Sequence, residues 1–497
     1  MTRGAARPRE PDVGALPPQA SLVPPGIRLR PDPSLTTLDG GRVLLGGSPY
    51  RLLRLGPPGV RQVAAWWRGD PVPSAPAARA LARKLLSAGL ANPDPPPGSG
   101  PGPGPGHGDV TVVIPVRDRP AELARCLAGC TGLQVIVVDD GSADPGAAPS
   151  AAAAAGARCI RLPVSLGPGA ARNAGLAAAA TPFAAFVDSD CIPLPGWLDP
   201  LLRHFTDPLV AAAGPRIVAA GPATPDRWLP GYEHARSALD MGATPSIVRP
   251  GARVPYLPAA ALVVRRAAAG QGFAAGLPVG EDVDFVWRLA EAGWHVRYEP
   301  GASVAHAHRV RLGAWFARRK DYGTSAAPLE LRHPGRVPAV SMSGWSALAW
   351  LAVAVGQPAA GASVMAATTA LLARKLAPAI SGPWPVALKL AGGGNLMAGR
   401  LLGSAISRTW WPLAVPAAVV FRRTRLPLAA MVLAAPILDW RERRPPMDPA
   451  RYVAARLMDD AAYSLGVWQG CLRHRTVRPL LPRLWWRSGN SEPGGPG

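Results

Sequence analysis

From residue 110 onward, strand-like and helical segments alternate along the chain, and this alternation restricts the possible folds more than any other feature of the sequence. The strand-like segments cover residues 110–116, 135–138, 158–162 and 183–187. Between them lie helical segments at 120–128, 147–155 and 170–179. Mostly apolar strands joined by helices are typically parallel and buried on both faces. The sequence therefore predicts an α/β fold with a doubly wound parallel sheet, whose ligands bind beyond the carboxyl ends of the strands.

Changes in composition predict how the chain is divided around this α/β domain, which we place at 109–335. Residues 93–108 include a run of alternating Pro and Gly that is typical of a linker. Before this linker, residues 27–92 combine two strand-like runs with two helical segments and predict a small strand-and-helix module. The Pro-rich residues 1–26 are predicted to be a disordered N-terminus.

An apolar region follows the α/β domain. Residues 340–373 contain no Asp, Glu, Lys or Arg, and a Gly356-Gln357-Pro358 break splits this run. A bilayer-spanning helix needs ~20 apolar residues, so the run is long enough for one tilted span or two half-spans. Later apolar segments at 410–421 and 426–438 are shorter and also fit an interfacial placement. We predict an apolar helical, membrane-associated region with a transmembrane helix at 336–445, then a C-terminal helix and basic tail at 446–497. The alternative is a buried all-helical domain, because Ala and Gly dilute the hydrophobicity.

The net charge of +22, from 54 Lys and Arg against 32 Asp and Glu, is compatible with nucleic acid, an anionic membrane or a diphosphate substrate. The late arginine clusters lie beside apolar segments and lack interleaved aromatics, which favours the membrane and argues against nucleic acid. Five scattered cysteines lack zinc-ligand spacing and indicate reduced thiols. We find no signal-peptide pattern. The apolar region predicts a cell-membrane location, and the reduced thiols place the α/β domain on the cytoplasmic side.

An acidic turn, Asp188-Ser189-Asp190, directly follows the strand-like segment 183–187. Carboxylates at this edge of a sheet suit a divalent cation such as Mn²⁺ or Mg²⁺, which prefers oxygen ligands and often keeps substrate phosphates in its shell. Such a cation acts as a Lewis acid on a leaving nucleoside diphosphate. We therefore assign Asp188 and Asp190 to a metal site, and Asp188 also to donor binding. The alternative is a simple turn, since Asp and Ser are common turn residues.

Two further motifs lie where a nucleotide donor is expected. Asp139 and Asp140 directly follow the second strand-like segment. A carboxylate there can accept a uracil N–H or contact ribose hydroxyls, with a helix cap or turn as the alternative. Residues 167–173 resemble a phosphate-binding loop at a helix start, with Arg172 where a dinucleotide-binding motif has its third glycine. This departure argues against a dinucleotide-dependent oxidoreductase and places a cation near a diphosphate.

Glu281 and Asp282 begin a helical segment that Gly293 ends. One of these carboxylates would be a general base that deprotonates an acceptor hydroxyl attacking an anomeric carbon, and a single displacement of this kind inverts the configuration. The alternative is a favourable pairing with the helix dipole, worth only ~0.3–1 kcal/mol. His306 and His308 follow strand-like segments at 295–298 and 302–305. His306 completes the metal shell, contacts the diphosphate or is structural.

In their order along residues 110–310, these motifs resemble the family 2 glycosyltransferases, whose nucleotide-binding fold is called GT-A. The matching segments are Val-Ile-Pro at 113–115, Val-Asp-Asp-Gly-Ser at 138–142, Ala-Arg-Asn-Ala-Gly at 171–175, Asp-Ser-Asp at 188–190 and Glu-Asp at 281–282. The site residues that this resemblance implies are Pro115 for the donor, Asp139 and Asp140 for uridine, Asp188 and Asp190 for nucleotide and metal, and Asp282 as base. The Gln-x-x-Arg-Trp motif of processive cellulose-type synthases is absent, which argues against long-chain polymer extrusion.

A closer resemblance, spanning most of the chain, is to the glycosyltransferases of the mycofactocin system. It is carried by Leu-Arg-Pro-Asp at 29–32, Leu-Asp-Gly-Gly at 38–41, the segment 254–266 and Tyr-Gly-Thr-Ser-Ala-Ala-Pro at 322–328. The resemblance implies a hexosyltransferase that moves glucose from UDP-glucose to a tyrosine-derived hydroxyl of a peptide-derived redox cofactor. It further implies extension to a β-1,4-glucan oligomer. The module at 27–92 also resembles the small peptide-recognition domains of such pathways.

Two other interpretations stay open. The apolar C-terminal region also fits a membrane glycosyltransferase that acts on a lipid-linked or cell-wall glycan. A catalytically inactive membrane-binding module is the third interpretation, and the intact Asp190 and Asp282 argue against it. Mn²⁺-dependent hydrolysis of a nucleotide sugar would separate an enzyme from a binding module.

Overall fold

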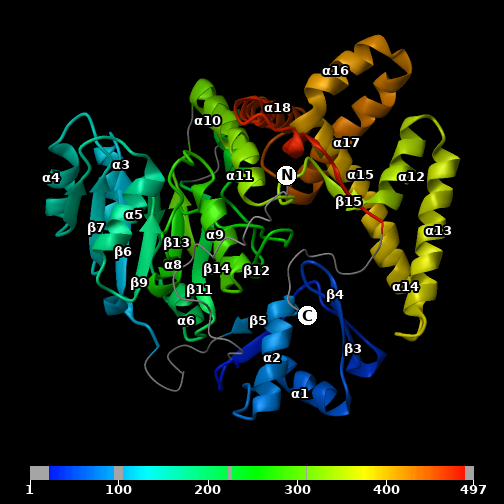
Figure 1. The fold of residues 1–497 in the computed structure, drawn as a ribbon, viewed down its shortest axis with the longest axis horizontal. Coiled ribbons are helices and arrows are strands. Elements are labelled where there is room, and N and C mark those ends of the chain that lie inside the picture. The colour runs from blue at the N-terminus through cyan, green and yellow to red at the C-terminus, as the bar shows by residue number, and fades with distance from the viewer. Residues whose placement is uncertain (1–21, 95–103, 222–226, 309–310, 487–497) are drawn as a thin grey trace, which may run out of the picture. The chain divides into compact units, whose positions relative to one another are not determined.

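The computed structural model describes residues 22–94, 104–221, 227–308 and 311–486. The predicted disordered N-terminus lies almost wholly outside these residues. The chain forms two compact units, which we call the N-terminal unit (1–222 and 236–308) and the C-terminal unit (223–235 and 309–497). Figure 1 follows the chain from the strands of the first unit to the helices of the second.

A mixed sheet of nine strands forms the centre of the N-terminal unit. One half is parallel, in the order β8 (Arg158–Arg161), β7 (Gln134–Asp139), β6 (Val110–Val116) and β9 (Phe183–Val187). The other half continues with β13 (Ala261–Arg265), β11 (Val210–Ala219), β14 (His295–His306) and β10 (Cys191–Pro193), while β12 (Ser246–Val248) pairs with β14. The predicted α/β fold is confirmed, and antiparallel pairing of β13 with β9 and β11 makes the sheet mixed.

Helices connect the parallel strands and set the position of the sheet's carboxyl edge: α3 (Pro120–Ala128), α4 (Ala147–Ala154) and α5 (Pro168–Ala178). Both α3 and α5 begin with proline, whose missing N–H costs nothing in the first turn of a helix. Gly175 lets α5 lie close against β6, since a Cβ there would be 2.2 Å from Cγ1 of Val113. This close approach fixes the height of Arg172, about one turn earlier on the same helix. Later helices of the unit are α6 (Asp199–His204), α8 (Arg266–Ala269) and α9 (Glu281–Glu291).

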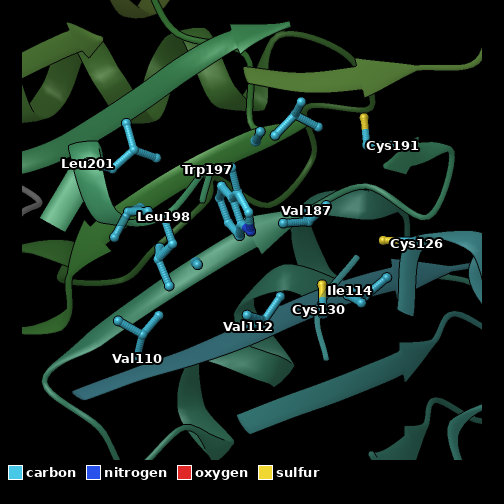
Figure 2. Close-up of a cluster of buried hydrophobic side chains, with 14 of the residues drawn as sticks. Val110, Val112, Ile114, Cys126, Cys130, Val187, Cys191, Trp197, Leu198 and Leu201 are labelled. Atoms are coloured by element: carbon cyan, nitrogen blue, oxygen red, sulfur yellow. The ribbon is translucent and has the colours of Figure 1, made fainter. Parts of the chain in front are cut away.

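The other face of β6 packs into the main hydrophobic core. Val110, Val112 and Ile114 alternate with Val113 along the strand and meet Trp197 and Leu198 in one cluster (Figure 2). Burial of each such aliphatic side chain contributes ~1.5–3 kcal/mol. The central strand is therefore packed on both faces and gives the loops at its carboxyl end a rigid support.

The N-terminal module, residues 22–94, has its own small core. An antiparallel sheet joins β2 (Thr36–Leu38), β3 (Val43–Gly46) and β4 (Arg51–Arg54), and a second pair joins β1 (Arg28–Pro31) to β5 (Ala91–Asp94). Helices α1 (Pro57–Trp67) and α2 (Pro76–Ala88) begin with proline, and α2 ends at the left-handed Gly89. Trp66, Leu85 and Leu86 are almost wholly buried between these elements.

The C-terminal unit is largely helical. Its helices are α7 (Trp228–Ala235), α10 (Leu312–Thr324), α11 (Ala326–Arg332), α12 (Gly344–Ala354), α13 (Pro358–Leu376), α14 (Pro383–Ala387), α15 (Gly393–Ala405), α16 (Trp411–Val420), α17 (Arg425–Arg443) and α18 (Pro449–Arg473). A short parallel pair joins β15 (Ser341–Ser343) to β16 (Arg483–Trp485). Gly323 and Gly466 allow α10 and α18 to cross closely, because a Cβ on Gly466 would lie 1.9 Å from the Lys320 carbonyl oxygen.

The transmembrane helix predicted within 336–445 is not found. Among the residues that the structure describes, no helix combines the length and the apolar sequence of a bilayer span. The apolar run is divided by Gly356, which has a φ of +83°, and by Pro358, so α12 contains only 11 residues. Such a helix is ~16 Å long, against a hydrocarbon core of ~30 Å. The following helix, α13, carries Arg374 and Lys375 in its last turn.

Candidate active site

The acidic motifs come together at the carboxyl edge of the parallel strands. Asp139 is the last residue of β7, and Asp188 directly follows β9. Asp190 lies just before β10, while Glu281 and Asp282 form the first turn of α9. The predicted clustering of these carboxylates therefore follows from the sheet topology.

Arg172 links the two sides of this acidic group. Its Nη2 donates to Asp188 Oδ1 at 2.5 Å and its Nη1 donates to Glu281 Oε1 at 2.7 Å. The side chain is buried, and although burial lowers the pKa of this guanidinium, the charges of Asp188 and Glu281 raise it by more. Arg172 thus stays cationic and bridges the carboxylates of Asp188 and Glu281.

Asp282 has the environment of a base that works near neutral pH. Its Oδ2 accepts the Ala259 N–H at 3.1 Å, and its Oδ1 accepts the Val283 N–H at 2.8 Å. Burial and, after it, the neighbouring charge of Glu281 raise the pKa of this carboxyl to about 7, although Arg172 and the two N–H groups act in the opposite direction. A carboxylate with a pKa near 7 is about half ionised at neutral pH, and its ionised form can accept a proton.

The first pair of aspartates organises two loops. Asp139 is fully buried and accepts from the Ser142 N–H, the Ser142 hydroxyl and Arg161. Asp140 accepts from the Ser165 hydroxyl at 2.8 Å and from the N–H groups of Leu166 and Gly167 at 2.7 and 3.0 Å. Asp140 therefore fixes the loop that leads into α5.

Pro115 is buried in β6 and stands opposite Val138 in the register of β6 and β7. It lies one position before the end of β6, beside the strand that Asp139 ends. The predicted donor residues Pro115, Asp139 and Asp140 are thus neighbours at one edge of the sheet.

The three residues predicted to bind metal separate into two contacts. Asp188 pairs with Arg172, whereas Asp190 Oδ1 faces His306 Nε2 at 3.7 Å. The second pair is brought together because Cys191 and His306 are partners in the antiparallel register of β10 and β14. Within the described residues, no group of three or more His, Cys, Asp or Glu side chains is arranged to hold a metal ion.

The comparisons with known proteins agree on one family. A model described as glycosyl transferase family 2 matches residues 111–254, and one described as glycosyl transferase family group 2 matches residues 185–423. Two curated relatives, from the CDC 1551 and H37Rv strains of Mycobacterium tuberculosis, are each named pre-mycofactocin glycosyltransferase. Each is 40% identical over 484 residues, which cover 94% of this chain and 99% of the relative. The chain belongs to the pre-mycofactocin glycosyltransferase family. It is accordingly a family 2 glycosyltransferase.

The chain also has some similarity to solved structures. One is a glucosyl-3-phosphoglycerate synthase from Mycobacterium tuberculosis in complex with Mn²⁺, UDP-glucose and phosphoglyceric acid. That structure is 20% identical, with a TM-score of 0.31, over 45% of this chain and 79% of the other. A Staphylococcus aureus TarS fragment is 15% identical, with a TM-score of 0.35, over 73% of this chain and 92% of the other.

The sequence motifs did not identify several polar residues that contact the aspartates of the site. Arg119 donates to Asp190 Oδ2 at 2.6 Å, and Arg161 pairs with Asp139. Ser165 and the Ala259 N–H each hold one of the other aspartates. The proline that follows Arg119 marks a helix start after a strand, where side chains reach the carboxyl edge, and this was the one local signal available.

Proposed function

We propose that this enzyme transfers glucose from UDP-glucose to the tyrosine-derived hydroxyl of the mycofactocin precursor, a peptide-derived redox cofactor, with inversion at the anomeric carbon. It then adds further glucose units through β-1,4 links. The two relatives named for this acceptor support the proposal over nearly the full length of the chain. The observation that carries the chemistry is a single carboxylate, Asp282, whose pKa is raised to about 7 at the carboxyl edge of the sheet.

Asp282 acts as the general base in this proposal. The acceptor oxygen forms its bond to the anomeric carbon while the bond from that carbon to the diphosphate oxygen breaks, and the hydroxyl proton moves to Asp282. Glu281 is held by Arg172. Glu281 therefore contributes a negative charge beside Asp282, which raises the pKa of Asp282 and makes it a stronger base.

The donor lies against the loops that Asp139 and Asp140 organise. We place the uridine beside Pro115 and these two aspartates, and the diphosphate near the start of α5, where N–H groups of a helix terminus attract anions. Asp188 faces the donor from the end of β9. Its contact with Arg172 keeps its carboxylate in one orientation.

A divalent cation, Mn²⁺ or Mg²⁺, fits the donor set of Asp190 and His306, with the donor's phosphate oxygens filling the rest of its shell. When bound, it would neutralise charge that develops on the leaving diphosphate. An imidazole beside a carboxylate suits Mn²⁺ better than Mg²⁺, which prefers oxygen ligands alone. Arg119 holds the other carboxylate oxygen of Asp190, Oδ2, while Oδ1 faces His306.

We also propose that the C-terminal unit binds the cytoplasmic face of the cell membrane through an exposed apolar surface. Apolar side chains along α16, the turn after it and the start of α17 are between 55% and 83% exposed: Leu413, Val415, Val419, Val420, Phe421 and Leu426. Arg422 and Arg423 lie exposed at this turn, and residues 410–438 contain no Asp or Glu. An apolar surface flanked by cations is suited to an anionic lipid surface.

The deciding experiment is incubation of the purified enzyme with UDP-glucose, Mn²⁺ and a tyrosine-derived acceptor, followed by mass measurement. Successive additions of one hexose mass are the expected result. If several such acceptors gain no hexose while a lipid-linked glycan does, the acceptor proposed here is wrong and the alternative stands. Asp190→Ala is the negative control for the chemistry.

A further inference from the structure

The loop between β12 and β13, residues 249–260, reaches the base at its C-terminal end. Ala259 donates its N–H to Asp282 Oδ2 at 3.1 Å. Four residues earlier, the Pro255 carbonyl accepts the Nε1–H of Trp287 at 2.8 Å. Both partners belong to α9, so this end of the β12–β13 loop is fitted to the helix that carries the base.

The other end of the β12–β13 loop is held by the N-terminal module. Arg253 forms a two-pronged pair with Asp32, with Nη2 at 2.9 Å from Oδ1 and Nη1 at 3.2 Å from Oδ2. The Arg253 N–H donates to the Ser48 hydroxyl at 2.6 Å. Arg249 donates from Nη1 to the Ser87 carbonyl at 3.0 Å and from Nη2 to the Ser48 carbonyl at 3.3 Å. Asp32, Ser48 and Ser87, from three separate parts of the module, thus form hydrogen bonds with residues 249–253 of the loop.

Asp32 is prepared for this contact within the module. It is only 5% exposed, and its Oδ1 also accepts the N–H and the hydroxyl of Ser34 at 2.9 and 2.5 Å. Its Oδ2 also accepts from Asn92 at 3.3 Å. A buried carboxylate that several donors fix is a stronger partner for a guanidinium than a mobile surface acid.

A second contact anchors the module independently of the β12–β13 loop. Arg83 of α2 pairs with both oxygens of Asp207 at 2.7 Å, and these two side chains are 14% and 8% exposed. Ser87 on the same helix lies 3.1 Å from Nε2 of His295 in β14. Arg83 therefore anchors the module on the catalytic domain without the loop, whereas Ser87 contacts both the loop and β14.

We propose that the N-terminal module is a positioning element of the active site, in which Asp32 and Arg253 hold the β12–β13 loop so that the Ala259 N–H stays on Asp282. Arg253 and Asp32 are positioning residues, since they act on the base through the loop. The inference deepens the proposed function and rests on Asp282 being its base.

The consequence for the base has a definite sign. An N–H that points at a carboxylate stabilises its ionised form. The groups that act on Asp282 are Glu281, which raises its pKa, and Arg172 with the N–H groups of Ala259 and Val283, which lower it. Loss of the hydrogen bond from the Ala259 N–H therefore makes the ionised form of Asp282 less stable and raises its pKa. The acid limb of the pH–rate profile then moves to higher pH.

The test uses the full-length enzyme with Arg253→Gln, Asp32→Asn, the double variant and Arg253→Lys. Arg30→Gln and Asp94→Asn are matched controls, since they remove another pair from the same module, at 72% and 37% exposure, that does not touch the loop. Hydrogen exchange of the peptide around Ala259 is the first readout, because it needs neither acceptor nor turnover. Melting temperature reports whether each variant is folded.

We expect Arg253→Gln and Asp32→Asn each to speed exchange at Ala259 about tenfold, the size that loss of one charge-assisted hydrogen bond gives. The double variant should be no worse than either single one, because both remove the same contact. Arg253→Lys should restore part of the protection, and the controls should change nothing. With an accepted substrate, kcat/KM for the acceptor falls and the acid limb rises, while the KM for UDP-glucose is unchanged.

Unchanged exchange at Ala259 in folded Arg253→Gln overturns the proposal, and so does an equal change in the Arg30→Gln control. If Asp32→Asn does not fold, the comparison of Arg253→Gln with Arg253→Lys still decides, because both leave the module intact. Failure of the proposed function has a different signature. The wild type then adds no hexose to the tyrosine-derived acceptor, whereas the exchange at Ala259 still responds to Arg253→Gln.

Discussion

The guanidinium of Arg172 and the carboxylate of Glu281 lie 2.7 Å apart, and both side chains are buried. This pair ties the start of α5 to the first turn of α9. It also keeps one negative charge beside Asp282 without leaving that charge unpaired. Removal of either partner should therefore change the base as well as the packing.

For Glu281→Gln we expect the acid limb of the kcat/KM profile to move to lower pH. Burial is the largest cause of the raised pKa of Asp282, and the charge of Glu281 is the second. Loss of that charge makes the ionised base easier to form. A pH–rate profile at saturating UDP-glucose measures the shift, and a limb that stays in place or moves upward contradicts it.

Asp282→Asn should lower kcat by ~10²–10⁴-fold, the usual contribution of a general base. The binding of UDP-glucose, followed by calorimetry, should be nearly unchanged because Asp282 faces the Ala259 end of the β12–β13 loop. An equal loss of donor affinity would instead place Asp282 in the donor site.

The same Asp282→Asn variant should be more stable than the wild type at pH 8. The folded pKa of Asp282 is about 7, above the unfolded value of ~3.9. The folded state therefore keeps a proton that the unfolded state loses, and stability falls as pH rises from about 4 to 7. Thermal unfolding should show a gap between variant and wild type that closes as the pH is lowered toward 4.

Replacement of His306 by Ala should raise the Mn²⁺ concentration needed for half-maximal activity by at least ~tenfold, since even groups outside the metal's own shell have effects of that size. Asp190→Ala should abolish the Mn²⁺ response, and a chelator should inactivate the wild type. His107→Ala is the control, because His107 pairs with Asp199 at the surface. An unchanged Mn²⁺ titration in His306→Ala would remove His306 from the metal site.

Binding to phosphatidylglycerol vesicles tests the exposed apolar turn of the C-terminal unit. The double variant Val420→Asp with Leu426→Asp should lose most sedimentation with these vesicles, because it places charge where acyl chains would be. Leu472→Asp changes a side chain that is 76% exposed on α18 and serves as the control. Equal losses in both variants would argue against this surface.

Substitution of Gly175 by Ala should destabilise the enzyme by ~1–3 kcal/mol, the usual cost of overpacking a core. The new Cβ would lie 2.2 Å from Val113 Cγ1. Val113→Ala in the same chain should recover part of the loss, as measured by denaturant unfolding. If Gly175→Ala alone costs nothing, α5 does not approach β6 as closely as described.

The parallel half of the sheet was predictable because its strands are apolar throughout and its helices begin with proline. Residues 110–116 and 183–187 are strands with the predicted bounds. The antiparallel half was harder, since β14 runs through Pro300 and Gly301, and the sequence divides it into two short strands. The predicted transmembrane helix failed because the Gly356-Gln357-Pro358 break, which is visible in the sequence, separates α12 from α13, and neither helix is long and apolar enough to span a bilayer.

The acidic residues of the site were predictable from their places after strands, but their partners were not. Arg119, Arg161 and Arg253 each pair with an aspartate that is distant in sequence. Apart from the proline after Arg119, no local pattern distinguishes these three from the other Lys and Arg residues, which total 54 in the chain. The contact of Asp32 with Arg253 depends on how the module is seated. Only the three-dimensional arrangement reveals it.

The separation of Asp32 and Arg253 by 221 residues also orders events during synthesis. At ~5–20 residues per second, the ribosome makes Arg253 about 10–45 s after Asp32. The module, with its own core, emerges early and carries a carboxylate whose partner does not yet exist. In the proposed arrangement the nascent chain therefore cannot fix the β12–β13 loop until Arg253 has been made and has returned to the module, which by then has had time to fold around Asp32.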